Sequence, residues 1–589
     1  MYLVYDVRGI QKYIFAVPKL KSIVGGSLLI DEFDSFTARN LAEDWHLETV
    51  FTGGGRGLFR SDSEEELEKF KEELVRQAHK IGLDLRIGKG SEEDGMPEAV
   101  DLYPFQPEIT EGAFPCALSG LWPVKSKDGI HKIIQMRQDK AKKLNLADQP
   151  ETKIKQVLGK IQDKFYEEFR EELKKRYNFI SAQIKELEKK TDSESKQELE
   201  KLKKRQTMLS NFLDQEKKFT LVFFRNVTPD SGDSKEELDE ATASASALGN
   251  RNRWAVVCMD GNDMGLQIKK TLDQKGQQPP ETTNWFRNFS KSLAECTEEA
   301  FKAALVNVVG QWFEKERDNL ESYCFQLNGQ NYLVLPFRPL ILGGDDVTIL
   351  CHGSYARAFV EQMSREFERI SKEKAAKIPG LWPATNDKLT ISGGVLFCKT
   401  SFPLAMAIEY ADALLANAKG SFRTKKQEGE PTPAAVDWET VTETLVDSPT
   451  ERRRREMMFH DPDLGGLEIH LTQKPYTLEE LNDLNNNEMR KLKDERTEEI
   501  KLPRSLRSNL LNALHQPWSL RAMFLASIGK RHKKLTEYLE ENPDDSQTGS
   551  WWTNDEEGVR KTRVIDAITL LDEETRMTQN TVGKEKLGD

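Results

Sequence analysis

Adjacent carboxylates lie in a glycine-containing segment near the middle of the chain. An apolar run leads into Gly343 and Gly344, Asp345 and Asp346 follow directly, and a second, β-branched run comes next. This order predicts two strands joined by a tight turn, in which glycine lets the backbone reverse and a ligand approach closely. Two neighbouring acids repel each other unless a cation relieves the repulsion, and a hard divalent ion that also binds phosphate oxygens would do so. Taken alone, the motif fits an ordinary polar hairpin tip as well.

A second acidic turn occurs earlier in the chain. Residues 254–259 read as a buried strand, which ends in a turn that starts at Asp260. Nucleotidyl transfer assisted by two metal ions needs carboxylates on adjacent strands of one sheet. We therefore expect Asp260 to lie beside Asp345 and Asp346. These three aspartates are the candidate catalytic residues and the candidate ligands for Mg²⁺ or Mn²⁺.

The two acidic segments resemble one family of proteins. Asp260–Gly265 and Arg338–Asp346 are similar to the second palm domain of the large polymerase/cyclase subunit of type III CRISPR effector complexes, in its Cmr-like form. Smaller signatures of the same family follow in order at Leu389–Val395, Tyr410–Lys419, Ala434–Trp438 and Pro475–Leu478. A series of signatures in order is far more specific than two glycines and two aspartates.

The resemblance implies a nucleotidyltransferase that is active when target RNA is bound. It would use ATP as substrate, and its product would be a cyclic oligoadenylate or ATP joined to S-adenosylmethionine. The implied reaction is the attack of a 3′-hydroxyl on the α-phosphate of ATP at a two-metal site. The implied partners are the other type III effector subunits, crRNA and target RNA. The sequence does not decide between the two products.

The resemblance also assigns residues to nucleotide binding. Lys419 would neutralise the triphosphate as a point charge, and Ser392 would help to define the base pocket. The complete set of nucleotide-binding candidates is Ser27, Gly54, Gly55, Arg56, Gly261, Asn262, Gly343, Gly344, Ser392 and Lys419.

Residues 1–120 resemble the first palm domain of the same family, through Gly9–Gln11 and Gly25–Ser27. The hairpin in the place of the acidic one carries three glycines and Arg56, and it has no acids. It therefore cannot hold the catalytic metals. Its backbone N–H groups and Arg56 could still cradle a nucleotide, although a simple glycine turn is the alternative.

We expect an α+β fold with two ferredoxin-like palm domains, at 1–120 and 253–421. Between them, residues 121–252 form a linker and a long helical insertion, which is either solvated or a docking arm, and Thr228–Asn252 reads as a loop. A connecting segment (422–475) leads to an all-helical domain (476–589). The helices expected there are Leu478–Lys493, Arg504–His515, Ser519–Ile528, Lys534–Glu541 and Arg560–Asp572, before a disordered tail after Thr578.

The net charge, the cysteine content and the length of the apolar runs limit the class of protein. The net charge of the 589 residues is -12, whereas a protein that coats nucleic acid is usually basic. Contact with RNA would therefore need a local basic groove or basic partners. Six cysteines without a CxxC pair argue against a disulfide framework and fit a reducing cytoplasm. We expect no membrane association, because no apolar run is long enough to span a bilayer and no signal peptide is recognisable.

Two features found in some relatives are not expected. The chain opens on the first palm strand, so we expect no HD nuclease domain and no nuclease activity. The pair His460–Asp461 reads as an ordinary surface pair. Cys116 stands alone in the linker, which makes a zinc site there doubtful.

Other functions remain open. The chain could be a stand-alone palm-domain signalling cyclase, or a non-catalytic scaffold subunit that holds guide-complex partners. The three repelling acids argue against the scaffold, because a protein without catalysis has no need to keep them. A lone diguanylate cyclase fits less well, because the motif is Gly-Gly-Asp-Asp and two palm-like units are expected.

Overall fold

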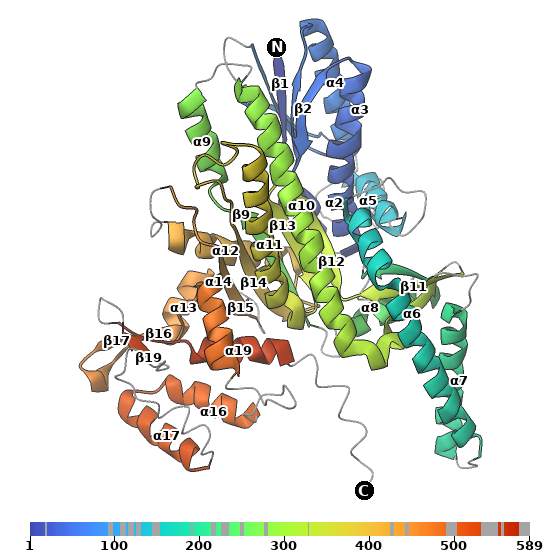
Figure 1. Ribbon diagram of the computed structural model, residues 1–589, viewed down its shortest axis with the longest axis vertical. Coiled ribbons are helices and arrows are strands. Elements are labelled where there is room, and N and C mark those ends of the chain that lie inside the picture. The colour runs from blue at the N-terminus through green and yellow to red at the C-terminus, as the bar shows by residue number, and fades with distance from the viewer. Residues whose placement is uncertain are drawn as a thin grey trace.

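The structure is a computed structural model of the chain (Figure 1). It describes residues 1–17, 20–91, 98–106, 114–115, 123–124, 131–143, 153–189, 193–213, 219–224, 235–247, 253–275, 281–327, 329–423, 429–441, 447–490, 504–531, 552–554 and 559–575. Long helices and several separate sheets confirm the α+β class.

The first sheet has the strand order β2-β3-β1-β4-β5. In the chain, β1 is followed by helices, the β2–β3 hairpin, helix α4 and then β4. This βαββαβ order, with β1 between β3 and β4, is the ferredoxin-like arrangement. The elements are β1 (Tyr2–Val7), α1 (Ile10–Ile14), α2 (Leu20–Glu32), the π-helix η1 (Phe33–Thr37), α3 (Ala38–Asp44), β2 (Glu48–Gly53), β3 (Arg56–Arg60), α4 (Glu64–Lys80), β4 (Leu85–Gly90) and β5 (Asp101–Tyr103).

Helix α4 shows how the sequence defines these elements. The Ser63 hydroxyl accepts a hydrogen bond from Glu66 N at 3.3 Å and so caps the helix. Acids at the next three positions are favoured by the helix dipole. The residues buried against the sheet recur every three or four positions, as Leu67, Phe70, Leu74 and Ala78.

The second sheet has the order β12-β13-β9-β14-β15-β18 and repeats the ferredoxin-like core. Helices α11 and α12 pack on opposite faces, because a Cβ at Gly393 would meet Val360 of α11 whereas one at Gly394 would lie 2.1 Å from Ala411 O of α12. The elements are β9 (Arg253–Gly261), α9 (Met264–Lys275), α10 (Glu281–Glu316), β12 (Phe337–Gly343), β13 (Asp346–Cys351), the 3-10 turn η3 (Gly353–Tyr355), α11 (Ala356–Lys377), β14 (Ile391–Lys399), α12 (Leu404–Arg423), β15 (Ala435–Thr440) and β18 (Tyr476–Thr477).

The insertion between the two palm segments contains the expected helical hairpin, formed by α6 and α7, and its strand β8 pairs with β11 of a hairpin, β10–β11, that lies between α10 and β12 in the second segment. The loop expected at Thr228–Asn252 is wrong in part, because α8 (Lys235–Ala247) lies there and buries Ala243 and Ala247 beside β10. The other elements are β6 (Phe114–Pro115), β7 (Pro123–Val124), α5 (Lys132–Lys143), α6 (Lys153–Leu187), α7 (Ser193–Leu213), β8 (Phe219–Phe223), the 3-10 helix η2 (Arg317–Tyr323), β10 (Cys324–Leu327) and β11 (Gln330–Leu335). Cys116 lies outside the described residues.

The region 476–589 is not all-helical as expected, because it contains β19 and β20, which form a four-stranded sheet, β16-β17-β20-β19, with two strands of the connecting segment. The helix expected from Arg560 starts at Val564, since residues 560–562 pair with neighbouring strands. Residues 534–541 and the tail after 578 lie outside the described residues. The elements are α13 (Pro449–Met457), β16 (Met458–Asp461), the 3-10 turn η4 (Pro462–Leu464), β17 (Leu467–His470), α14 (Leu478–Asp483), the π-helix η5 (Leu484–Met489), α16 (Arg504–Leu514), α17 (Trp518–Arg531), β19 (Trp552–Asn554), β20 (Arg560–Thr562) and α19 (Val564–Thr575).

The surface pair expected at His460–Asp461 is half wrong. His460 is exposed, but Asp461 is fully buried and accepts a hydrogen bond from Arg521 Nη2 at 2.8 Å. A buried carboxylate needs such a partner, because an unpaired charge is strongly disfavoured away from water. Asp461 therefore joins β16 to α17.

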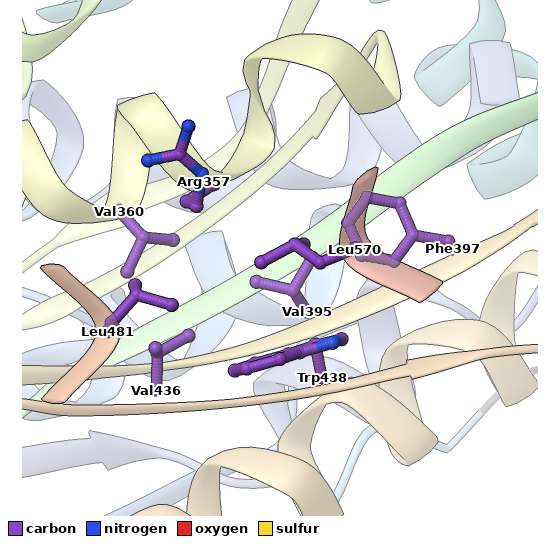
Figure 2. Close-up of a pocket in the computed structure, with 8 residues that line it drawn as sticks. All are labelled: Arg357, Val360, Val395, Phe397, Val436, Trp438, Leu481 and Leu570. Atoms are coloured by element: carbon purple, nitrogen blue, oxygen red, sulfur yellow. The ribbon is translucent and has the colours of Figure 1, made fainter. Parts of the chain in front are cut away.

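The C-terminal region packs on the outer part of the second sheet. Figure 2 shows side chains of α14 and α19, Leu481 and Leu570, converging on Val395 of β14 and Trp438 of β15. This packing fixes the far edge of the second sheet. No helix among the described residues is long and apolar enough to cross a bilayer.

Candidate active site

The structure brings Asp260, Asp345 and Asp346 together. Strand β13 runs antiparallel to β9 with Val347 opposite Met259, so the next pair outward is Asp346 and Asp260. Asp345 stands at the tip of the same hairpin. One oxygen of each carboxylate lies within 4.8 Å of the other two. Residues far apart in the sequence thus form one acidic cluster at the edge of the second sheet.

Burial and mutual repulsion perturb two of these acids. The pKa of Asp345 is raised well above its usual value, first by burial and then by the charges of Asp260 and Asp346. The side chain of Asp346 reaches the surface, yet desolvation by the surrounding protein, followed by the charge of Asp260, raises its pKa to about 7. Three crowded carboxylates provide the oxygen ligands that Mg²⁺ and Mn²⁺ prefer. The residues present therefore fit the expected metals.

Lys419 is the cation nearest to the cluster among the residues assigned to the site. Its ammonium group donates hydrogen bonds to Asp260 Oδ2 and, at 2.7 Å, to Gly261 O. Helix α12 can bring Lys419 this close because it packs directly on Gly394 of β14. The lysine partly balances the acids, and it stands where it could also meet the negative charge of a phosphate.

Two glycines of the predicted set have a steric role. A Cβ at Gly261 would lie 2.9 Å from the Cβ of Asp345, so a larger residue would push the acid away from Asp260. Gly344 has a φ of 59°, in the left-handed region that glycine adopts without strain. Both glycines thus shape the cluster through the backbone.

Asn262 and Ser392 are buried beside the cluster. The Asn262 amide donates to Thr390 Oγ1 at 2.9 Å and to Ser392 Oγ at 3.0 Å. Ser392 lies opposite Asp260 in the sheet register and is fully buried. Their hydrogen bonds hold the end of β9 against β14, so in this structure both residues support the acidic turn from within the sheet.

The candidates of the first sheet lie against the second. Ser27 donates a hydrogen bond to Leu340 O on β12. A Cβ on Gly343 would lie 3.4 Å from the Cα of Gly54, so the two glycine hairpins meet backbone to backbone. Arg56 pairs with Asp6 at 2.7 Å, and its side chain is 67% exposed, which leaves most of the guanidinium surface accessible.

The glycine hairpin of the first sheet is held in place by a buried acid. Asp34 Oδ2 accepts a hydrogen bond from Gly55 N at 2.6 Å, and Asp34 Oδ1 accepts one from the Tyr5 hydroxyl at 2.7 Å. Gly54 and Gly55 both have left-handed backbone angles, with φ of 65° and 79°. Sequence reasoning did not identify Asp34, because nothing in the spacing links it to the hairpin.

A pocket opens between the two sheets and reaches the acidic cluster at Asp346. The pocket includes Gln11 and Asp412, which were not among the predicted site residues. Asp412 lies two helical turns before Lys419, and this i, i+7 spacing on one helix face is the signal that could have identified it.

Comparison with protein families gives one match. Residues 253–427 match the family described as Cas10/Cmr2, second palm domain. The matched segment contains β9, the acidic hairpin and α12, and therefore all three aspartates and Lys419. These residues are similar to a Cas10/Cmr2 second palm domain. Within this palm, the acidic hairpin lies beside β9 and α12 lies across the sheet.

No match was found among curated proteins. Solved structures similar to the chain include a Csm1–Csm4 cassette in complex with cA4, at 12% identity and a TM-score of 0.43, and one in complex with pppApA, at 13% and 0.45. Both similarities cover 98% of this chain and 69% of the other. A Csm1–Csm4 subcomplex of the type III-A CRISPR-Csm interference complex is similar at 13% identity and a TM-score of 0.43, over 98% and 70% of the two chains.

Proposed function

We propose that this chain is the nucleotidyltransferase subunit of a type III CRISPR effector and that it makes a nucleotide second messenger from ATP. The observation that carries the proposal is the convergence of Asp260, Asp345 and Asp346 at one sheet edge, with their ligand oxygens within 4.8 Å of one another. The match of the surrounding residues to a Cas10/Cmr2 second palm domain supports it.

The chemistry follows from the charges at the site. Divalent ions held by the three aspartates would lower the pKa of an attacking 3′-hydroxyl and stabilise the charge on the phosphates. Lys419 binds the triphosphate as a point charge. Gly343 and Gly344 add no side chain at the hairpin tip, so a phosphate can approach its backbone. Asp345 and Asp346 must lose their protons when they become ligands.

The product is a cyclic oligoadenylate or a conjugate of ATP with S-adenosylmethionine, and both need the same attack on an α-phosphate. The proposed partners are sibling effector subunits, crRNA and target RNA. The net charge of -12 favours RNA contact through partner subunits over contact through this chain alone. The stand-alone cyclase and the non-catalytic scaffold are the alternative functions.

The test is incubation of the chain with radiolabelled ATP and Mg²⁺ or Mn²⁺, with and without S-adenosylmethionine. It is run first alone and then with guide complex and target RNA. We expect labelled product that depends on the RNA-bound complex. Full activity without guide or target RNA would instead support the stand-alone cyclase.

The double variant Asp345→Ala/Asp346→Ala tests the site directly. We expect it to abolish product formation while the circular dichroism spectrum stays unchanged, because the two residues lie at a hairpin tip. Asp62→Ala is the control, since that carboxylate lies between β3 and α4, is 94% exposed, and its loss should leave activity unchanged. Full activity of the double variant would reject the metal assignment, and a complex without any product in all conditions would favour the scaffold.

A further inference from the structure

The pocket between the sheets has apolar as well as polar walls. Residues of both halves contribute to them, including Ile10 and Ile14 of the first half and Leu342 and Leu415 of the second. Flat apolar faces with a few polar groups are the environment in which a nucleobase is usually held, whereas a ribose or a triphosphate needs many polar partners. The apolar side chains of the pocket can therefore hold the flat faces of a base, in the same pocket as Asp346.

A polar contact joins the two halves of the chain within the pocket. Gln11 Nε2, from α1, donates a hydrogen bond to Asp412 Oδ2, on α12, at 2.7 Å. Both residues line the pocket, and the Gln11 side chain is exposed. An ionised carboxylate can only accept hydrogen bonds. Asp412 thus turns the nitrogen end of the Gln11 amide towards itself and fixes its orientation.

A fixed amide still has one N–H and its carbonyl oxygen for a ligand. A donor and an acceptor side by side match the edge of adenine, where an amino group lies next to a ring nitrogen. The corresponding edge of guanine offers O6 and N7, two acceptors, so the amide oxygen would face another acceptor. Purine without the amino group would lose the hydrogen bond to the amide oxygen.

We propose that Gln11 reads the base of the bound nucleotide and that Asp412 is the positioning residue that orients its amide. This pair selects a base with an amino donor beside a ring acceptor. The inference rests on the proposed function, because it concerns the nucleotide that the site would use. It adds a specificity-determining contact that comes from the first half of the molecule, although the acids lie on the second.

The position of Asp412 agrees with this role. It lies near Cys258, which is two residues before Asp260 on β9 and on the same face of that strand. Two residues of a strand span about 7 Å. A base at Asp412 and phosphates at the acidic cluster are therefore separated by a distance that one nucleotide can bridge.

The test is the binding of three nucleotides to the full chain with Mg²⁺ by calorimetry: ATP, GTP and purine ribonucleoside triphosphate. We expect ATP to bind about fivefold more tightly than the purine analogue, because one hydrogen bond is lost. In Gln11→Ala this ratio should fall close to one, and in Asp412→Ala it should fall part of the way. The double variant should be no less selective than Gln11→Ala, because Asp412 acts through Gln11.

Glu409→Gln is the matched control, since Glu409 is an exposed carboxylate one turn before Asp412 on the same helix. It should keep the wild-type ratio. Gln11 is exposed, so its replacement should not unfold the chain. An unchanged ratio in Gln11→Ala, or equal binding of ATP and the purine analogue by the wild type, would overturn the inference but leave the proposed function intact. If the wild type binds no triphosphate, the proposed function itself is rejected, and the inference with it.

Discussion

In the first sheet Asp6 of β1 lies opposite Arg56 of β3, whereas in the second sheet Asp260 of β9 lies beside Asp346 of β13. The surrounding backbone is closely similar. Each hairpin is next to the first strand of its unit, and each has a register shift on its outer strand, at Thr49/Phe51 in one and at Pro339/Ile341 in the other. The same scaffold therefore carries two different hairpin tips.

The difference lies in the balance between acids and cations. Arg56 gives Asp6 a cation from within the chain, in an ion pair of 2.7 Å. Asp346 gives Asp260 a second negative charge, and the resulting repulsion contributes to raising the pKa of Asp346 to about 7. In the first hairpin the negative charge of the acid is paired with a cation. In the second hairpin an added cation would relieve the repulsion between the acids. The tips differ at two positions, with Gly55 and Arg56 in one and Asp345 and Asp346 in the other, and we propose that these positions decide whether such a sheet can bind a metal.

The most severe test of this comparison places the arginine of the first hairpin tip at the matching position of the second tip. In Asp346→Arg, the guanidinium should pair with Asp260 as Arg56 pairs with Asp6, and a metal ligand is lost. We expect nucleotide product to fall by a factor of about 10³ or more, as expected when charge stabilisation of the transition state is removed. The measurement is product formation by the RNA-bound complex, with binding of Mn²⁺ as a second readout. Arg56→Lys, which keeps the charge of the first tip, is the control and should keep most activity.

A smaller effect is expected from the cation that the second sheet already has. Lys419→Gln removes the positive charge beside Asp260 and keeps much of the side-chain length. We expect kcat/KM for ATP to fall by about 10- to 100-fold, because one charge-assisted contact to phosphate is lost. Steady-state kinetics measures this change. If kcat/KM stays the same while stability falls, Lys419 serves only to balance the acids.

The raised pKa values also predict how pH affects stability. Asp345 and Asp346 hold protons more tightly in the folded chain than in the unfolded chain, so without metal the stability falls as pH rises from about 4 to about 7. Asp345→Asn removes part of this repulsion and should raise the melting temperature at pH 8 by roughly 2 °C. Calorimetry without metal measures the shift. The increase should disappear at pH 4, where the carboxyl groups of Asp345 and Asp346 are protonated. An equal rise of the melting temperature at both pH values would show that charge repulsion is not its cause.

The smallest effect is expected at the first tip. Arg56→Ala breaks the ion pair with Asp6, but the arginine side chain is 67% exposed. Solvent-exposed ion pairs contribute about 0–1 kcal/mol to the free energy of unfolding. Urea unfolding should therefore show little change. A clear loss of ATP binding in this variant would show that Arg56 serves the nucleotide rather than the fold.

The sequence predicted the parts of the site that are encoded locally. Buried strands that end in acids placed Asp260 beside Asp346, because strand order in a ferredoxin-like unit leaves few alternatives. The pair Gln11 and Asp412 was missed, because it forms only when segments from the two ends of the chain meet. Helix α8 was missed because its alanines and serines have little amphipathic pattern, and packing beside β10 decides its structure. The burial of Asp461 depends likewise on a distant residue, Arg521.

Gly54 and Gly343 touch through main-chain atoms alone. A methyl group on Gly343 would fit there in van der Waals contact, whereas a large side chain would separate the two halves that enclose the pocket. Replacement of Gly343 by a large side chain could therefore inactivate the protein without removing any of the three aspartates. Loss of activity after such a change would reflect the separation of the two halves. It would not test the roles of the three aspartates in catalysis.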